Sequence, residues 1–359
     1  PLSRASGRAE DRLRYLQNLG TVSLVEGRYD DAVALYHQAL DEQQRGGLGE
    51  LTRVVPLNNL GSVSLAREDH EGGERFLLEA LAIEERILGP DHPNVGLDLA
   101  NLGLVAQDHG DLDLARERLE RALALLERAH AKPTSDMAGL HNNLGTVASK
   151  QGREDEAREH LQQALEIWEE TLGPEHPFVA MPLGNLCGMA IDARQLDQAS
   201  ELCERAFVLN ERAYGPDHIE VAHVHIWLGN IAGDRGEQDA AWDHYHRALE
   251  IAEKAAGPDS VTTGRAARGL GGVLLERGLA GEALPWLERA NTILHAEAQD
   301  EAAADFSLAQ ALWDAPKDAG RDRPRSRSLA ESARAGLAEK PGLFRDDIDR
   351  WLAEHPAPD

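Results

Sequence analysis

The chain has 359 residues, of which 42% are hydrophobic and only 4% aromatic, so aliphatic side chains must form its core. Its formal charge of −26 comes from 63 acidic against 37 basic residues. A surface this negative would repel a phosphate backbone, which excludes nucleic acid as an expected partner. The acidic excess keeps a large exposed surface soluble, and a basic partner is the alternative explanation.

No apolar run reaches membrane-spanning length and no signal peptide opens the chain, so we expect no membrane insertion by this segment. The chain starts at Pro1 without a preceding Met, which suggests a processed chain or a fragment of a longer protein. Only two cysteines occur, Cys187 and Cys203, which argues against a secreted disulfide framework and favours a reducing, cytoplasmic location. They fall on facing helices of one predicted repeat and could lie close together, although two small core residues are the simpler interpretation.

An internal repeat runs along the chain in steps of 42 residues. Its anchor is a leucine, usually within Asn-Leu-Gly, and the anchors are Leu19, Leu60, Leu102, Leu144, Leu186, Leu228 and Leu270. The first interval is 41 residues and the next five are 42. Columns of small residues, such as the alanines 20 residues after each anchor, let neighbouring helices approach closely. Each step is therefore predicted to be one helical unit stacked on the next.

Each unit is predicted to contain two helices. In the third unit, apolar spacing predicts a first helix over 93–108 and a second over 112–129, with a break at Gly110. Gly-Pro-Asp-His-Pro at 89–93 and Gly-Pro-Glu-His-Pro at 173–177 are typical of one helix ending and the next beginning. Their histidines recur once per unit, which gives no local set of metal ligands, so we expect them to cap helices or pack the loops.

These features resemble the tetratricopeptide repeat, in the longer form seen in kinesin light chains. The residues that carry the resemblance in the fourth unit are Leu144-Gly145, Gly152, Glu156-Ala157, Ala164-Leu165-Glu166-Ile167 and Leu172-Gly173-Pro174-Glu175-His176-Pro177. The resemblance implies an all-α fold, a right-handed superhelix of seven helical pairs with a partial eighth and a C-terminal capping helix. It implies a single array over 1–359, with repeats at 12–51, 52–93, 94–135, 136–177, 178–219, 220–261 and 262–300, and the partial repeat and cap at 301–359.

The tail resembles the repeat regions attached to bacterial serine/threonine kinases, notably in myxobacteria. The segments that carry this resemblance are Asp305 to Trp313, Arg321 to Arg327, Leu329 to Ala335 and Ile348 to Leu352. It implies that a kinase domain precedes the repeats; this chain contains no kinase motif, so any kinase activity would lie outside it. In physical terms the tail is predicted to form helices over 302–314, 326–338 and 344–354, the last covering the end of the array, with 321–327 as a solvated loop.

No catalytic or metal-binding motif stands out. His223 and His225 are two residues apart on a predicted helix and point away from each other, and His244 and His246 do the same. No His-Glu-x-x-His, Cys-x-x-Cys or nucleophile elbow occurs. We therefore expect a non-catalytic protein without a metal or cofactor.

A column of asparagines is the most informative polar pattern. Its members precede the anchor leucines, and two units add a second asparagine: Asn18, Asn59, Asn101, Asn143 and Asn185, with Asn58 and Asn142. The family resemblance places this edge on the concave surface and implies that such asparagines hold peptide ligands. An amide can donate to and accept from the backbone of an extended peptide. Bonds that join neighbouring helices are the alternative role, and one column could serve both.

In units six and seven the column changes to Trp227 and Gly269. Trp227 could anchor a partner or fill the core. Helix geometry adds further inward-facing candidates: Lys150, Asn230, Arg265 and Arg268, with Arg14, Gln17, Thr21, Ser62, Thr146 and His223. This groove would be polar and mildly basic inside an acidic molecule, which favours an acidic or carboxylate-bearing peptide.

We therefore expect a protein-interaction scaffold that binds an extended partner segment in its concave groove, as the regulatory or docking part of a bacterial, kinase-linked signalling protein. Two alternatives stay open. The array could form a homodimer through its ends or convex face, or it could hold a small-molecule sensor or enzyme site inside the superhelix.

Overall fold

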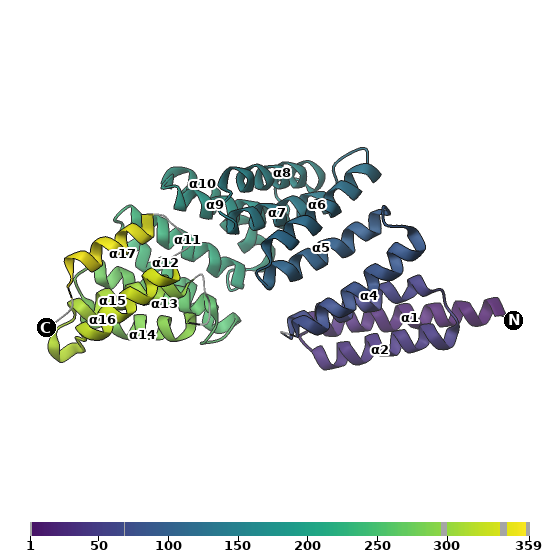
Figure 1. Cartoon of the computed structure of the whole chain (residues 1–359), viewed down its shortest axis with the longest axis horizontal. Helices are drawn as coiled ribbons and strands as arrows, with labels where there is room; N and C mark the ends of the chain where they lie inside the picture. Colours follow the sequence, from purple (N-terminus) through teal and green to yellow (C-terminus); the bar gives the residue numbers. More distant parts are fainter. Residues whose placement is uncertain (1, 68, 296–299, 338–342, 357–359) are drawn as a thin grey trace. The chain divides into compact units, whose positions relative to one another are not determined.

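The computed structural model describes residues 2–67, 69–295, 300–337 and 343–356, and every regular element in these ranges is helical (Figure 1). This confirms the all-α prediction. The chain divides into two compact units, Pro1–Pro174 and Glu175–Asp359. No helix in the described ranges is both long and apolar enough to cross a membrane.

The first compact unit is built from helical pairs. In its described residues the pairs are α1 (Leu2–Val25) with α2 (Tyr29–Gly46), α3 (Val54–Ala66) with α4 (His70–Leu88), α5 (Pro93–Asp108) with α6 (Leu112–Ala129), and α7 (Ser135–Lys150) with α8 (Glu154–Leu172). A 3-10 turn, η1 (Glu50–Arg53), precedes α3. The second helix of each pair also packs on the first helix of the next, so one core runs through the stack.

The second compact unit continues the same pattern. Its described elements are η2 (Pro177–Val179), α9 (Ala180–Asp192), α10 (Leu196–Tyr214), α11 (Ile219–Asp234), α12 (Gln238–Ala255), α13 (Val261–Glu276), α14 (Ala280–Leu294), α15 (Glu301–Asp314), η3 (Lys317–Ala319), α16 (Arg323–Gly336) and α17 (Leu343–Glu354). The helices α9 to α16 pair in order, and α17 packs on α16.

The helix boundaries of the third repeat fall where the sequence predicts them, at Pro93–Asp108 and Leu112–Ala129. The turn between them depends on Gly110, whose φ of 80° is a left-handed conformation that glycine adopts without strain. Asp111 then caps α6, because its Oδ1 accepts a hydrogen bond from the Leu114 backbone N–H at 3.1 Å.

The histidines of the linkers are helix caps. The Nδ1 atom of His92 accepts a hydrogen bond from the backbone N–H of Asn94 at 3.2 Å, and His176 and His218 cap their helices in the same way at 3.2 and 3.3 Å. This confirms the predicted capping role and explains why a histidine stands at the same place in these three linkers.

The two helices of a pair approach most closely at the glycine that follows the anchor leucine. A Cβ on Gly103 would lie 2.9 Å from the Cγ of Leu119, and a Cβ on Gly145 would lie 2.7 Å from the Cγ of Leu161. Each such glycine faces a large side chain 16 residues later, and the pairs are Gly20–Tyr36, Gly61–Leu77, Gly103–Leu119, Gly145–Leu161, Gly229–Tyr245 and Gly271–Leu287. The helices therefore interlock by filling a glycine notch with one bulky side chain.

In the fifth unit this notch holds Cys187 and Cys203, which form a disulfide with a Cα–Cα distance of 5.5 Å. Both residues are fully buried. The interpretation as two small core residues is therefore incomplete: they belong to the core, but α9 and α10 also place them close enough to bond.

The tail forms the predicted end of the array. Phe306 on α15 packs edge-on against Trp351 on α17, whose ring also packs against Trp313. The prediction of a solvated loop over 321–327 is wrong, because α16 begins at Arg323. Arginines of this stretch join neighbouring segments instead, since Arg327 Nη1 donates to the carbonyl of His355 at 2.6 Å and Arg325 Nη2 donates to Glu288 Oε2 at 2.8 Å.

Candidate functional site

The asparagine column of the first compact unit presents amides without a hydrogen-bond partner among the described residues. Asn18, Asn59, Asn101 and Asn143 lie at the same register on α1, α3, α5 and α7, exposed or half-buried. Within the described residues none of the four side chains makes a hydrogen bond. Their donors and acceptors are therefore free for a partner. Lys150, at the end of α7, is exposed as well.

The second asparagine of units two and four has a different environment. Asn58 donates through Nδ2 to Asp98 Oδ1 at 2.6 Å, which joins α3 of one repeat to α5 of the next. Asn142 is buried on α7 and has an interaction within the protein. The Asn58 side chain thus joins two neighbouring repeats. Among the described residues, Asn58 and its neighbour Asn59 differ in that only Asn58 is hydrogen-bonded within the fold.

Asp98 is an unusual carboxylate, only 2% exposed. Burial raises its pKa to about 7, which the Asn58 hydrogen bond only partly offsets and which nearby Glu84 raises further. Burial also raises the pKa of Glu84, although Asn94 donates to it at 3.4 Å. One oxygen of each carboxylate, and Oδ1 of Asn58, are buried without a donor among the described residues.

In the second compact unit, Asn185 and Trp227 line one cavity of about 500 Å³. Met181 and Asn185 reach it from α9, and Asn210 and Tyr214 from α10. The Trp227 ring lies against Gly184, where a Cβ would be 2.9 Å away, so the ring forms a fixed wall. Asn185 has an interaction within the protein, unlike its counterparts among the described residues of the first compact unit.

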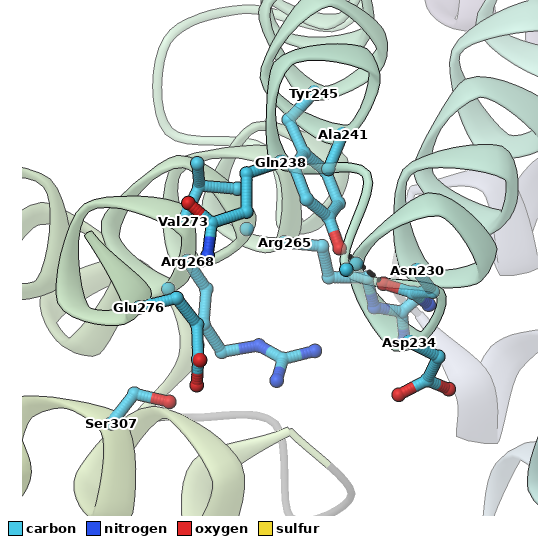
Figure 2. A pocket seen from close by; sticks show the side chains of 14 residues that line it. Asn230, Asp234, Gln238, Ala241, Tyr245, Arg265, Arg268, Val273, Glu276 and Ser307 are labelled. Atoms are coloured by element: carbon cyan, nitrogen blue, oxygen red, sulfur yellow. Dashed lines mark hydrogen bonds between the residues drawn. The ribbon is translucent and has the colours of Figure 1, made fainter.

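A second cavity of about 260 Å³ lies between α11, α12, α13 and α15 (Figure 2). It gathers three of the predicted groove residues: Asn230, Arg265 and Arg268. The Tyr245 hydroxyl donates to Asn230 Oδ1 at 2.7 Å, which leaves the amide nitrogen of Asn230 for other acceptors. Burial raises the pKa of Tyr245 to about 12, so this hydroxyl stays protonated.

The two arginines of this cavity differ in availability. Arg265 donates through Nε and Nη2 to Asp300 Oδ2 at 2.9 and 2.7 Å, so its charge is already neutralised. Arg268 makes no hydrogen bond or ion pair among the described residues, and its Nε is buried without an acceptor. Figure 2 shows its side chain extending into the open centre of the cavity, between Glu276 and Asp234. Of the two arginines, Arg268 is therefore the one whose charge is not paired among the described residues.

Tyr245, Asp234 and Glu276 line this cavity but were not predicted from the sequence. Tyr245 stands 16 residues after Gly229, so the spacing between each notch glycine and its bulky partner could have placed it beside the first helix. The two carboxylates carry no comparable signal in a chain with 63 acidic residues.

Two pairs of histidines also escaped the sequence analysis. His141 and His160 place their Nδ1 atoms 3.0 Å apart, and His225 and His244 repeat this arrangement two units later, also at 3.0 Å. Burial lowers the pKa of His141 and of His225 to about 4, so each pair is neutral near pH 7 and one Nδ1–H donates to the facing Nδ1. No group of three or more metal-ligating side chains occurs among the described residues.

Comparison with known proteins identifies the repeat. A tetratricopeptide repeat model matches residues 52–128, 136–186 and 224–294, which is more than half of the chain, and two further models of the same description match 183–220 and 16–47. No curated protein matches the chain.

Several solved structures share the fold. BtubC (BKLC) from P. vanneervenii is 23% identical with a TM-score of 0.52, over 64% of this chain and 91% of that one. The apo form of RapI is 14% identical with a TM-score of 0.62, over 95% and 92% of the two chains. A Rap protein complexed with Competence and Sporulation Factor is 13% identical with a TM-score of 0.61, over 97% and 100%. At these identities the likeness shows the fold.

Proposed function

Because the chain belongs to the tetratricopeptide repeat family, whose members are scaffolds for protein–protein interaction, we propose that it binds an extended segment of a partner protein along its first helices. The observation that carries this proposal is the column of unpaired amides. Asn59, Asn101 and Asn143 repeat at one register on three successive first helices, while the adjacent Asn58 is used within the fold. An amide can pair with a peptide backbone whatever its side chains are.

The cavity of the second compact unit, taken by itself, is expected to select partner segments by charge through Arg268. A guanidinium with a buried, unpaired Nε binds a carboxylate far better than it binds a neutral group, because the carboxylate replaces hydrogen bonds that the fold does not provide. Asn230 adds an amide donor beside it. We therefore expect a partner segment with an Asp, Glu or C-terminal carboxylate at the position that enters this cavity.

The wider setting is part of the same proposal. The 42-residue period continues unbroken from Leu60 to Leu270, which supports one repeat array across both compact units. The tail resemblance supports a docking or regulatory role within a bacterial, kinase-linked signalling protein, without catalysis by this chain. We place the protein in the cytoplasm, where a disulfide is kept only transiently. One structural neighbour, the Rap protein, was solved with a bound factor, so this kind of fold can hold a partner.

A peptide-array screen tests the proposal. Arrays of extended peptides should give binders enriched in acidic residues. Arg268→Met should weaken these binders by about 10- to 150-fold, since a charge-assisted hydrogen bond contributes about 1.5–3 kcal/mol. Arg128→Met is the matched control, because this arginine lies exposed on α6, a second helix in the other compact unit. An array without any binder would refute peptide binding, whereas binders that ignore Arg268→Met would refute only the selectivity.

A further inference from the structure

The fifth repeat departs from its neighbours at two positions of the same helical hairpin. The first is the notch between its helices, where the other units place a glycine against a leucine or tyrosine. Here Cys187 on α9 and Cys203 on α10 fill the notch and are joined by a disulfide. The fifth hairpin is thus closed by a covalent bond at the point where the others are closed by packing.

The second departure is the turn that connects α9 to α10. The corresponding turns of units three, four, six and seven use Gly110, Gly152, Gly236 and Gly278, all with φ between 73° and 80°. Unit five has Arg194 at this place, with φ of 57°, the only non-glycine residue with a positive φ among the described residues. A side chain in the left-handed region destabilises the turn, because its Cβ crowds the following carbonyl. The non-covalent closure of this hairpin is therefore weaker than that of its neighbours.

We propose that the Cys187–Cys203 disulfide is a redox-controlled clasp that compensates for the strained turn and sets the stability of the fifth repeat. Oxidised, it holds α9 against α10. Reduced, the hairpin has neither the clasp nor the glycine turn, and it opens more readily than any neighbouring unit. This inference does not depend on peptide binding.

The chemistry is a two-electron thiol–disulfide exchange. A dithiol reductant of the thioredoxin class attacks one sulfur as a thiolate, passes through a mixed disulfide and leaves as an intramolecular disulfide, while Cys187 and Cys203 become thiols. Reoxidation runs the exchange in reverse against a disulfide oxidant. Both cysteines are fully buried, so the exchange requires the hairpin to open first, and opening and reduction reinforce each other.

The clasp has a consequence for the cavity of about 500 Å³ beside it. Met181 and Asn185 form one wall from α9, and Asn210 and Tyr214 form another from α10. The disulfide joins the helices that carry these walls. Reduction therefore loosens a cavity on the predicted groove, and a partner seated there would be held more weakly.

Hydrogen exchange of the full chain tests the clasp. The disulfide closes a loop with a sequence separation of 16 residues, and a crosslink of this span should change the opening equilibrium by roughly 100-fold. Amides of α9 and α10 should then exchange about 100-fold faster after treatment with dithiothreitol, whereas amides of α5 and α6 should not change. Intact mass after alkylation without reductant should show no free thiol in the oxidised protein.

The matched control is Cys187→Gly with Cys203→Leu, which installs the pair found in units two, three, four and seven. Exchange in this variant should be insensitive to dithiothreitol, and adding Arg194→Gly should slow exchange in α9 and α10. Free thiols in air-oxidised wild type, or exchange that dithiothreitol leaves unchanged, would overturn the proposal. An equal response to dithiothreitol in the double variant would overturn it too. If the variant does not fold, the wild-type comparison with and without reductant decides alone.

Discussion

Replacing Asp98 with asparagine should stabilise the first compact unit at neutral and alkaline pH. The carboxyl is 2% exposed, and burial raises its pKa to about 7 from an ordinary value of 3.8. A raised pKa means that the folded chain holds this proton more tightly than the unfolded chain. The associated stability is complete below pH 3.8 and is lost as the pH rises through about 7. The full difference corresponds to about 4 kcal/mol of destabilisation at pH 8.

Asp98→Asn removes this ionisation while keeping the shape of the side chain. Asn58 can still donate to Oδ1 of the new amide. The amide nitrogen replaces Asp98 Oδ2, an oxygen that is buried without a donor, and it adds a donor to a cluster in which Glu84 Oε2 and Asn58 Oδ1 also lack one. Burying an amide has its own cost, so we expect a net gain of about 2–4 kcal/mol at pH 8 and little change at pH 4.

Denaturant unfolding at pH 4 and pH 8, followed for the wild type and the variant, measures the effect. Asp108→Asn is the matched control, because Asp108 lies exposed on the same helix and should leave stability unchanged at both pH values. The reasoning would be refuted by a variant that is less stable than wild type at pH 8, or by a substitution that stabilises the chain as much at pH 4 as at pH 8.

Two further predictions test other parts of the account. Gly271→Ala should destabilise the chain by about 1–3 kcal/mol because its Cβ would lie 2.5 Å from Leu287. The control Gly272→Ala meets nothing within 4 Å and should be neutral or stabilising. Thermal unfolding of the two variants checks this, and equal effects would contradict the close packing of Gly271 against Leu287. The pKa values of His141 and its partner His160 are lowered, so the stability that this pair contributes is present above about pH 6.5 and is lost as the pH falls towards 4. Repeat two has Leu57 and Phe76 at the corresponding positions. His141→Leu with His160→Phe should therefore make unfolding less sensitive to acid between pH 4 and 6.5. An unchanged acid sensitivity would show that the histidine pair does not limit stability.

Much of the fold follows from the sequence because it repeats. The helices of unit three could be placed to the residue, since Gly110 and Asp111 mark a turn and a cap by local chemistry alone. The linker histidines were equally predictable, because a cap depends on its own neighbours. The arginines of 321–327 were not. Their partners, such as Glu288 and the carbonyl of His355, lie far along the chain, and only folding brings them near.

The candidate site was predictable in part for the same reason. The register of the asparagines could be counted, but whether each amide is free depends on its neighbours in space. Asn58 and Asn59 look alike in sequence, yet Asp98 of the next repeat binds only Asn58. The two cysteines of the disulfide have the same 16-residue spacing as the glycine and its bulky partner in the other repeats. This spacing is visible in the sequence, but it indicates contact only once the two helices are known to meet at these positions.

The central claim is that the free asparagine column binds an extended peptide, and calorimetric titration tests it most directly. A peptide selected from the array is titrated into wild type and into Asn59→Ala with Asn101→Ala and Asn143→Ala. A matched control carries Glu117→Ala and Gln162→Ala, two exposed residues on second helices. At about 1 kcal/mol for each lost hydrogen bond, the triple variant should bind about 100-fold more weakly with unchanged thermal stability, and the control should bind like wild type. Equal affinity of the triple variant and wild type would contradict the claim.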